Sequence, residues 1–250
     1  MRARLTTSIA CLVTSLIATV ARADAPSAIV EAAAPDAAAS DPGAGQLVVS
    51  STALTRPAGS LTLASHMGLT GVVYGVNDRV EVGGYILPTF LVTRPEGVSA
   101  AITAKLALVN RGPVRVALET RAGTLEQSWW YAEASAIATA CVDRACATLV
   151  NAEATVGRRL VTGSTDDSSG GRYLESRLAV GAQVRIADHV KLVADVAWAR
   201  ETYTAGPAAD ALLLAPGVRV HGRAWMVQAA AAIDALSGDA LPWISAAYRF

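Results

Sequence analysis

The feature that most constrains this chain is an alternation of apolar and polar residues with a period of two. In residues 113–121, 173–186 and 190–199 the even positions are mostly apolar, and every charged residue lies at an odd position. This period is that of a β-strand with one apolar and one polar face, whereas an amphipathic helix repeats near 3.6 residues. The chain is therefore predicted to fold mainly as β-sheet.

Extending this pattern predicts twelve strands after residue 45, joined by connections of two kinds. Tight turns such as 110–112 and 187–188 alternate with longer links such as 158–171 and 201–210, and the link from Cys141 to Cys146 belongs with the short ones. Short turns on one side and long loops on the other are typical of an up-and-down sheet that crosses a membrane. The predicted strands are 46–54, 60–75, 79–92, 98–109, 113–122, 127–140, 146–157, 172–186, 189–200, 211–221, 223–235 and 241–250, and the first has the weakest pattern.

Composition favours a membrane barrel over a soluble sheet. The chain is 52% hydrophobic, with a mean hydropathy of +0.37, and only 17% charged, against about 25% in a typical soluble domain. After the N-terminus no stretch is a credible membrane helix, since the uncharged run 57–77 contains a proline and several glycines. Alternate residues facing lipid would supply the apolar excess without a contiguous run. A soluble periplasmic β-protein is the alternative.

The charge balance and the motifs exclude several function classes. The 21 basic residues equal the 21 acidic ones, whereas a nucleic-acid partner calls for a basic excess gathered on one face. The sequence has no phosphate-binding loop of the Walker type, no H-E-x-x-H motif and no metal-ligand cluster. We therefore expect no cofactor, no metal and no nucleic-acid partner.

The N-terminal segment predicts export. Two arginines precede the charge-free run Leu5 to Ala21, and an A-x-A pattern ends at Ala23, which is the layout of a cleaved signal peptide over residues 1–23. An uncleaved anchor helix is the alternative. Residues 24–45 are a mixture of Ala, Pro and Asp and predict a disordered periplasmic linker, so that the barrel would span 46–250.

The last predicted strand carries a resemblance to a known family. Ile244, Ala246, Tyr248 and Phe250 share one face, and the chain ends on the phenylalanine. This resembles the C-terminal signal of porin-like bacterial outer-membrane β-barrel proteins. The resemblance implies an all-β, up-and-down antiparallel transmembrane barrel of about twelve strands, with ten as the alternative. It also implies that Tyr248 and Phe250 form the assembly signal, and that outer-membrane lipids and the barrel assembly machinery of a Gram-negative bacterium are the partners. The oligomeric state stays open.

Charged residues on the polar face are predicted to line the lumen of this barrel. They would form either a network that rigidifies a narrow barrel or a constriction that selects solutes by charge. Within the hairpin around Asp143, we expect Glu133 to face Glu153, with arginines compensating the two carboxylates. The predicted lumenal residues are Arg79, Glu81, Lys105, Arg115, Glu119, Arg121, Glu133, Glu153, Glu175, Arg177, Arg185, Lys191 and Asp195.

Few other residues suggest chemistry. Cys141 and Cys146 are expected to form a disulfide in an oxidising periplasm, the alternative being two thiols too badly oriented to bridge. His66 adjoins Ser65 in a predicted strand, and a histidine with a serine on the wall would suit a lipid-modifying enzyme. Because neighbours in a strand point to opposite faces, these two cannot pair by themselves. We therefore expect no catalytic residues and no enzyme activity.

These observations predict a protein of the bacterial outer membrane without specifying a solute. The first hypothesis is a passive pore or small transporter for polar solutes, motivated by the mixed charges of the predicted lumen. The second is a structural or surface-interaction barrel whose lumen is plugged and which acts through its long loops. A lipid-modifying enzyme is the third.

Overall fold

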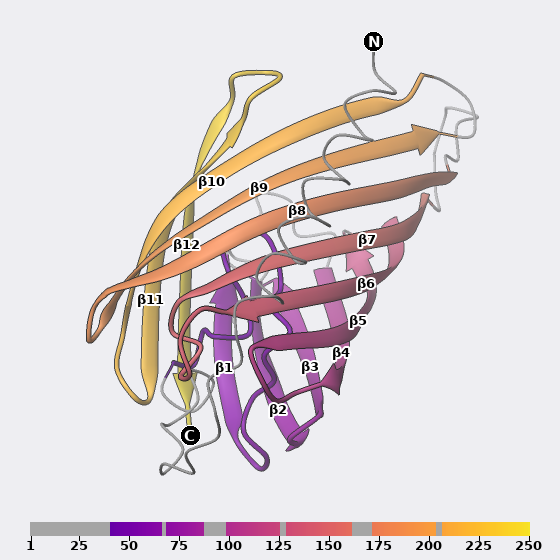
Figure 1. Ribbon diagram of the computed structural model, residues 1–250. Coiled ribbons are helices and arrows are strands. Elements are labelled where there is room, and N and C mark those ends of the chain that lie inside the picture. The colour runs from indigo at the N-terminus through magenta and orange to yellow at the C-terminus, as the bar shows by residue number, and fades with distance from the viewer. Residues whose placement is uncertain (1–40, 67–68, 88–98, 126–128, 162–171, 204–206) are drawn as a thin grey trace.

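A computed structural model describes residues 41–250 apart from 67–68, 88–98, 126–128, 162–171 and 204–206 (Figure 1). Twelve antiparallel strands close into one barrel, in which each strand pairs with its chain neighbours and β1 pairs with β12. In the described part of the chain, no helix is long and apolar enough to span a membrane. The prediction of an all-β, up-and-down barrel of about twelve strands is confirmed.

The strands differ in length, from 6 residues in β1 to 16 in β8. The longer strands run obliquely across the barrel wall (Figure 1), as closure of a sheet into a barrel requires. In chain order the strands are β1 (Leu61–His66), β2 (Leu69–Asn77), β3 (Val80–Leu87), β4 (Ser99–Val109), β5 (Val114–Leu125), β6 (Trp129–Cys141), β7 (Leu149–Val161), β8 (Arg172–Ala187), β9 (Val190–Tyr203), β10 (Ala209–His221), β11 (Trp225–Asp234) and β12 (Ala240–Arg249).

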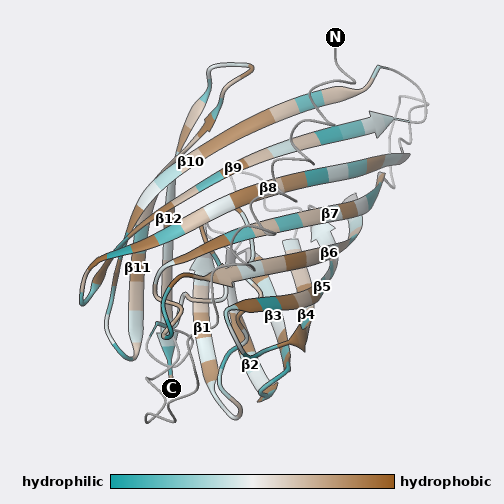
Figure 2. Cartoon of the chain, viewed as in Figure 1, coloured by the Kyte–Doolittle hydropathy of each residue, from teal (hydrophilic) through white to brown (hydrophobic). Residues whose placement is uncertain are grey.

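Alternation decides which side chains face the lumen. Along β7, Glu153 and Thr155 are buried inside the barrel, whereas Val156 on the outer face is 59% exposed. Large apolar side chains are exposed in the same way around the wall, including Ile102 and Ile244. Figure 2 shows how hydrophobic residues recur along the strands. An outer surface of this kind suits lipid rather than water.

The two ends of the barrel differ in their connections. The five links that contain residues 78–79, 110–113, 142–148, 188–189 and 222–224 lie at the end where the chain enters β1 and leaves β12. At that end the Phe250 amide donates a hydrogen bond to the Leu61 carbonyl at 2.9 Å. We call this the short-turn end and the opposite one the long-loop end.

Residues 41–60 are not part of the barrel wall, and we call them the plug. The predicted strand 46–54 is wrong, because this segment has only an isolated bridge between Gln46 and Ser51. Residues 50–54 are all buried in succession, so the segment is enclosed and has no solvated face that alternation could mark. The count of twelve remains because the predicted strand 60–75 divides into β1 and β2.

The plug also overlaps the predicted linker 24–45. Residues 41–44 are buried inside the barrel, held by contacts with strands distant in the sequence that composition could not indicate. Residues 1–40, which include the predicted signal peptide, lie outside the described part of the chain.

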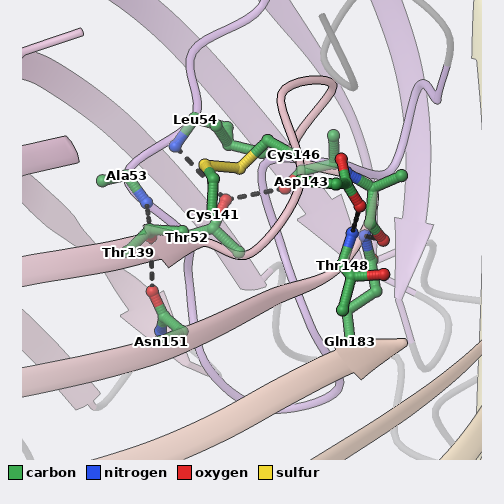
Figure 3. Close-up of a disulfide and its surroundings, with 12 residues drawn as sticks. Thr52, Ala53, Leu54, Thr139, Cys141, Asp143, Cys146, Thr148, Asn151 and Gln183 are labelled. Carbon is green, nitrogen blue, oxygen red and sulfur yellow. Dashed lines mark hydrogen bonds between the residues drawn. A yellow bond between two sulfur atoms is a disulfide. The ribbon is translucent and has the colours of Figure 1, made fainter. Parts of the chain in front are cut away.

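A disulfide closes the turn between β6 and β7 (Figure 3). It joins Cys141 and Cys146, whose Cα atoms are 4.6 Å apart. The carboxylate of Asp143 accepts hydrogen bonds from the backbone amides of Ala147 and Thr148 at 2.9 and 2.7 Å. Both cysteines also belong to a buried apolar cluster that contains Leu54 of the plug. The turn is therefore fixed covalently beside the plug.

Replacing both cysteines by serine is expected to lower the free energy of unfolding by about 2 kcal/mol, because a short covalent loop no longer restricts the unfolded chain. Urea unfolding of the barrel in detergent measures this difference. Reduction of the wild-type protein should reproduce the shift, and reduction of the double serine variant should have no effect. An unchanged midpoint in the serine variant would contradict the prediction.

Candidate functional site

The candidate site is the lumen at the level of the plug, where inward-facing side chains of the wall meet the backbone and side chains of residues 41–60. These inward positions are the odd-numbered ones in β2–β10 and β12, and the even-numbered ones in β1 and β11. Because the polar parity of each strand points inward, the lumen is lined by charged, amide and hydroxyl groups. Their contacts with the plug hold residues 41–60 inside the barrel.

A buried ion-pair triad holds the start of the plug. The Asp41 carboxylate lies 2.5 Å from Nζ of Lys191 on β9 and 3.3 Å from Nη1 of Arg219 on β10. All three side chains are at most 1% exposed. Burial alone would raise the pKa of Asp41, but the charges of Arg219 and Lys191 outweigh burial and lower it to about 2. Asp41 is thus a carboxylate at neutral pH.

Arg219 connects the plug to several strands. Its guanidinium donates to the plug carbonyls of Gly43 at 2.9 Å and Gln46 at 2.5 Å. It also donates to the side-chain oxygens of Gln183 on β8 and Gln228 on β11, each at 2.9 Å or less. Because Arg219, Gly43, Gln183 and Gln228 are all buried, the loss of Arg219 would leave several acceptors without partners.

Two wall carboxylates accept hydrogen bonds from the plug backbone. Asp195 on β9 accepts from the amides of Val48 and Val49 at 2.7 and 2.8 Å, and from the Ser50 hydroxyl at 2.7 Å. Glu153 on β7 accepts from the amide of the next plug residue, Ser51, at 2.7 Å. Charge-assisted bonds of this kind are stronger than neutral ones. They fix the middle of the plug against β7 and β9.

The hydroxyl and amide side chains of β6 and β7 extend this contact. The Thr139 hydroxyl accepts from the Ala53 amide at 2.8 Å and bonds to Asn151 at 2.7 Å, and the Asn151 amide donates to the Ser51 carbonyl at 2.7 Å. The plug backbone at Ser51 and Ala53 is therefore hydrogen-bonded to wall side chains.

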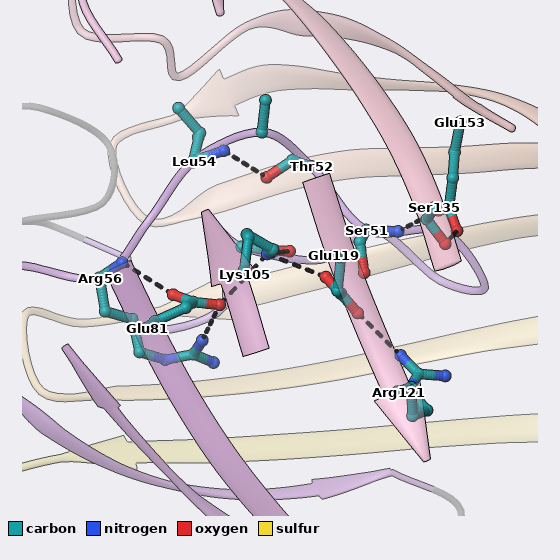
Figure 4. Close-up of polar contacts among 12 residues, drawn as sticks. Ser51, Thr52, Leu54, Arg56, Glu81, Lys105, Glu119, Arg121, Ser135 and Glu153 are labelled. Carbon is teal, nitrogen blue, oxygen red and sulfur yellow. Dashed lines mark hydrogen bonds and ion pairs between the residues drawn. The ribbon is translucent and has the colours of Figure 1, made fainter. Parts of the chain in front are cut away.

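A second ion-pair chain crosses β3, β4 and β5 (Figure 4). Glu81 lies 3.2 Å from both Arg56 of the plug and Lys105, and Lys105 lies 3.4 Å from Glu119, which pairs with Arg121 at 3.1 Å. Lys105 also donates to the plug carbonyl of Gly45 at 3.2 Å. Charges of both signs therefore alternate along this wall and end at the plug.

Nearer the long-loop end the lumenal charges pair with one another. Arg159 lies 2.5 Å from Glu175 and donates to the Tyr173 hydroxyl at 2.9 Å. Arg177 lies 3.0 Å from Glu153. The side chains of Arg159 and Arg177 are 24% and 20% exposed, so this part of the lumen is more accessible than the plug contacts.

The predicted lumenal residues divide into three groups. Glu81, Lys105, Glu153, Lys191 and Asp195 contact the plug directly. Glu119 and Arg177 pair with members of that group, and Arg121 pairs with Glu119. Glu175 pairs with Arg159, and Arg115 and Glu133 are partly buried on the inward face.

Two of the predicted lumenal residues do not line the lumen at plug level. Arg79 is exposed in the turn between β2 and β3, because β2 continues to Asn77 and leaves no strand position for it. Arg185 keeps the inward parity but is exposed near the short-turn end of β8. Arg79 thus lies outside the strands, and Arg185 lies at an inward strand position away from the plug.

The predicted pairing of Glu133 with Glu153 is also wrong. Glu133 faces Gly157 and Glu153 faces Ile137. The disulfide-closed turn begins at Val142 and ends at Thr148, so the centre of the hairpin lies two residues later than expected. Glu153 is therefore free to accept from the plug, with Arg177 beside it.

Sequence reasoning missed Asp41, Arg56 and Arg219, as well as the two glutamines that bond to Arg219. Arg219 lies on the inward parity of a predicted strand, so the alternation alone could have indicated it. Asp41 and Arg56 lie in segments without strand periodicity and gave no such signal.

The histidine side chains that the structure describes are not grouped with other metal-ligating residues. The side chain of His66 lies outside them, and Ser65 is near Thr70 at 3.4 Å. The rings of His189 and His221 are 6.0 Å apart at the short-turn end. Within the described ranges, no three His, Cys, Asp or Glu side chains are grouped to hold a metal ion.

The Asp41 triad predicts a pH dependence. The pKa of Asp41 falls from 3.8 to about 2 in the folded protein, so its contribution is fully present above pH 4 and is lost as the pH falls through about 2. The shift corresponds to roughly 2 kcal/mol. The free energies of unfolding of the wild type and of Asp41→Asn, measured between pH 7 and pH 2, give this contribution as the difference between the two proteins. The difference between them should shrink below pH 4, and a constant difference would contradict the prediction.

Comparisons with known proteins support the fold. The structure of an outer membrane channel from Pseudomonas putida F1 is similar, with a TM-score of 0.55 and 12% identity over 78% of this chain and 96% of that one. The outer-membrane expressed OmpT of Vibrio cholerae has a TM-score of 0.44 and 12% identity over 73% of this chain and 64% of that one. This chain thus spans less than two thirds of that OmpT chain.

Comparison of the sequence alone gives a different result from comparison of the fold. A scan against protein-family models finds no match, and a search of curated proteins finds none either. At this level of identity the structural likeness bears on the fold alone. The fold is that of bacterial outer-membrane β-barrels, as the resemblance of the C-terminal strand implied.

Proposed function

We propose that this protein is an outer-membrane channel for small polar solutes that is closed in the present conformation by the plug. Its short-turn end would face the periplasm and its long-loop end the outside, as in other outer-membrane barrels. The exposed apolar outer face supports a membrane location, as does the exposed aromatic pair Tyr248 and Phe250 at the C-terminus, the proposed assembly signal. The fold is shared with the Pseudomonas putida protein, which is an outer membrane channel, and the proposal extends a channel role to this chain.

The observation that carries the proposal is that the wall closes without the plug. β1 pairs with β12 over Thr62 to His66, so no strand position is left for residues 41–60 to fill. The plug is held instead by ion pairs and hydrogen bonds to polar side chains. Such contacts can be replaced by contacts with water, whereas a wall strand could not leave a membrane barrel. A complete wall around a segment held by polar contacts supports a channel that this segment closes.

The lumenal charges support polar solutes without a strong preference for either sign. Beyond the plug, the arginines of β5, β7 and β8 alternate with the glutamates paired to them. A ring of one charge would select ions of the opposite sign, while a mixed lining would not. The open channel should therefore have a reversal potential near zero in a salt gradient.

Planar-bilayer recording of the full chain and of a variant lacking residues 41–54 tests the proposal. The full chain should be mostly closed and the deletion variant should conduct continuously. Deletion of residues 24–37, which has the same length and precedes the plug, is the matched control and should behave as the full chain. Heat-modifiable migration on a gel verifies that each barrel is folded.

A folded variant that lacks residues 41–54 and does not conduct would contradict the channel proposal. It would favour the second candidate, a structural or surface-interaction barrel that acts through its long loops. The observation behind this candidate is that wall charges at plug level, such as Lys191 and Glu81, form ion pairs with plug residues.

A further inference from the structure

Charged residues on the outward face gather at one place. Among the strand residues whose side chains are described, these are Arg158 of β7, Arg200 of β9 and Asp210 of β10, all near the long-loop end. Apart from Arg172 at the first position of β8, the other outward positions of the described strands carry apolar, hydroxyl or glycine residues. Figure 2 shows hydrophilic residues toward this end of β8 and β9. A charge on a lipid-facing surface costs free energy unless it lies at headgroup depth.

Aromatic side chains indicate that depth. Trp198 precedes Arg200 by two residues on the same outward face, and Trp130 of β6 is 53% exposed near the same end. At the short-turn end, Trp225 and Tyr248 are exposed on the outward face. Exposed Trp and Tyr mark the two membrane interfaces. From the start of β9 to Arg200 the strand rises roughly 33 Å, which at a tilt of about 40° spans about 25 Å, the height of the apolar band of such barrels.

The two arginines are available for a ligand. The side chain of Arg158 has no ion-pair or hydrogen-bond partner among the described residues. Arg200 has only a distant contact with Asp210, at 4.0 Å, and its side chain is 41% exposed. Exposed pairs at this distance contribute little. The guanidinium groups therefore stand at the interface with most of their donors unused.

The register brings both arginines to the same neighbouring strand. Arg158 pairs with Leu174 of β8, and Arg200 pairs with Ser176, two residues along. Their Cα atoms are thus roughly 12 Å apart, given the spacing of strands and residues in a sheet. Long side chains at that separation can reach two phosphates of one headgroup from either side of β8.

We propose that Arg158 and Arg200 bind the phosphate groups of lipopolysaccharide, whose phosphorylated glucosamine headgroup lies in the outer leaflet. The site goes beyond the channel function and rests only on the membrane placement and orientation given with it. Guanidinium groups bind phosphate through paired hydrogen bonds, and basic residues at a membrane interface attract anionic headgroups. Asp210 weakens the site by holding part of the Arg200 charge.

Native mass spectrometry of the delipidated full chain, titrated with lipid A that carries two phosphates, tests the site. Arg158→Gln and Arg200→Gln should each weaken binding about fivefold, and the double variant about twenty-fold. Asp210→Asn should strengthen it. The double variant Arg79→Gln, Arg111→Gln removes two exposed arginines from the short-turn end, and should leave binding unchanged. A double variant of Arg158 and Arg200 that binds as the wild type does would overturn the site.

Two further ligands identify the source of the phosphate. Dephosphorylated lipid A should bind wild type no better than it binds the double variant, and phosphatidylglycerol should bind more weakly than lipid A. Equal affinity for phosphatidylglycerol would overturn the assignment to lipopolysaccharide. Lipid A binding by a barrel that never conducts would overturn the channel and leave this site intact.

Discussion

Replacing Arg219 by methionine is expected to lower the free energy that holds the plug inside the barrel by about 3 to 5 kcal/mol. The side chain is fully buried and bonds to Asp41, to two plug carbonyls and to the glutamines of two strands. Removal of one partner from a buried ion pair leaves the others uncompensated in a medium of low dielectric. Methionine keeps most of the length of the side chain, so the loss comes from charge and hydrogen bonds.

Hydrogen exchange of the plug amides measures this loss. Protection of Val48 and Ala53, which bond to Asp195 and Thr139, should fall at least hundredfold, since about 1.4 kcal/mol corresponds to a factor of ten. Arg185→Met removes an exposed arginine near the short-turn end of β8 and is the control. Unchanged protection of these amides in Arg219→Met would show that the plug does not depend on the triad.

Asp195→Ala should also release the middle of the plug, and we expect it to lower the free energy that holds the plug in place by about 3 to 9 kcal/mol. Its carboxylate accepts from two backbone amides and one hydroxyl of the plug, and each buried donor left without an acceptor costs about 1 to 3 kcal/mol. Ser50→Ala removes only the hydroxyl donor and should cost much less. The order Asp195→Ala, then Ser50→Ala, then wild type is expected in plug exchange rates.

Asp188→Ala is the matched control for this series, because Asp188 is exposed in the turn that leads into β9. It removes the same charge at the short-turn end without a plug contact. If Asp188→Ala raised the exchange rates as much as Asp195→Ala, net charge rather than the hydrogen bonds of Asp195 would control the plug.

The barrel wall was predictable because its determinants are local. In a strand, inward and outward positions alternate, so Glu153, Lys191 and Asp195 could be placed on the lumenal face from their parity. The same rule placed Arg185 on that face but could not give its depth, which depends on where the strand ends. The hairpin register failed for a related reason, because it depends on the length of the turn that the disulfide closes.

The plug was not predictable because its determinants are distant in sequence. Asp41 bonds to Lys191 150 residues away, and Ser51 bonds to Glu153 102 residues away. Nothing in the Ala- and Pro-rich composition around Asp41 distinguishes a linker from a segment that is buried by others. The apolar run near Val48 predicts a strand, whereas the amides of Val48 and Val49 bond to the Asp195 side chain.

The most direct test of a channel closed by residues 41–60 is to lock the plug reversibly to the wall. A Cβ atom at Gly43 would lie 3.1 Å from Cγ of Met226 on β11, the position that a cysteine sulfur would take, so Gly43→Cys with Met226→Cys should form a disulfide. These two cysteine substitutions are combined with Arg219→Met, which loosens the plug, and with the change of both native cysteines to serine.

Conductance is then recorded in planar bilayers before and after reduction of the same sample. The account predicts that the oxidised protein is cross-linked and closed, and that reduction opens it. A cross-link that fails to form would contradict the placement of Gly43 beside Met226. An oxidised channel that conducts as well as the reduced one would contradict the claim that the plug closes the lumen.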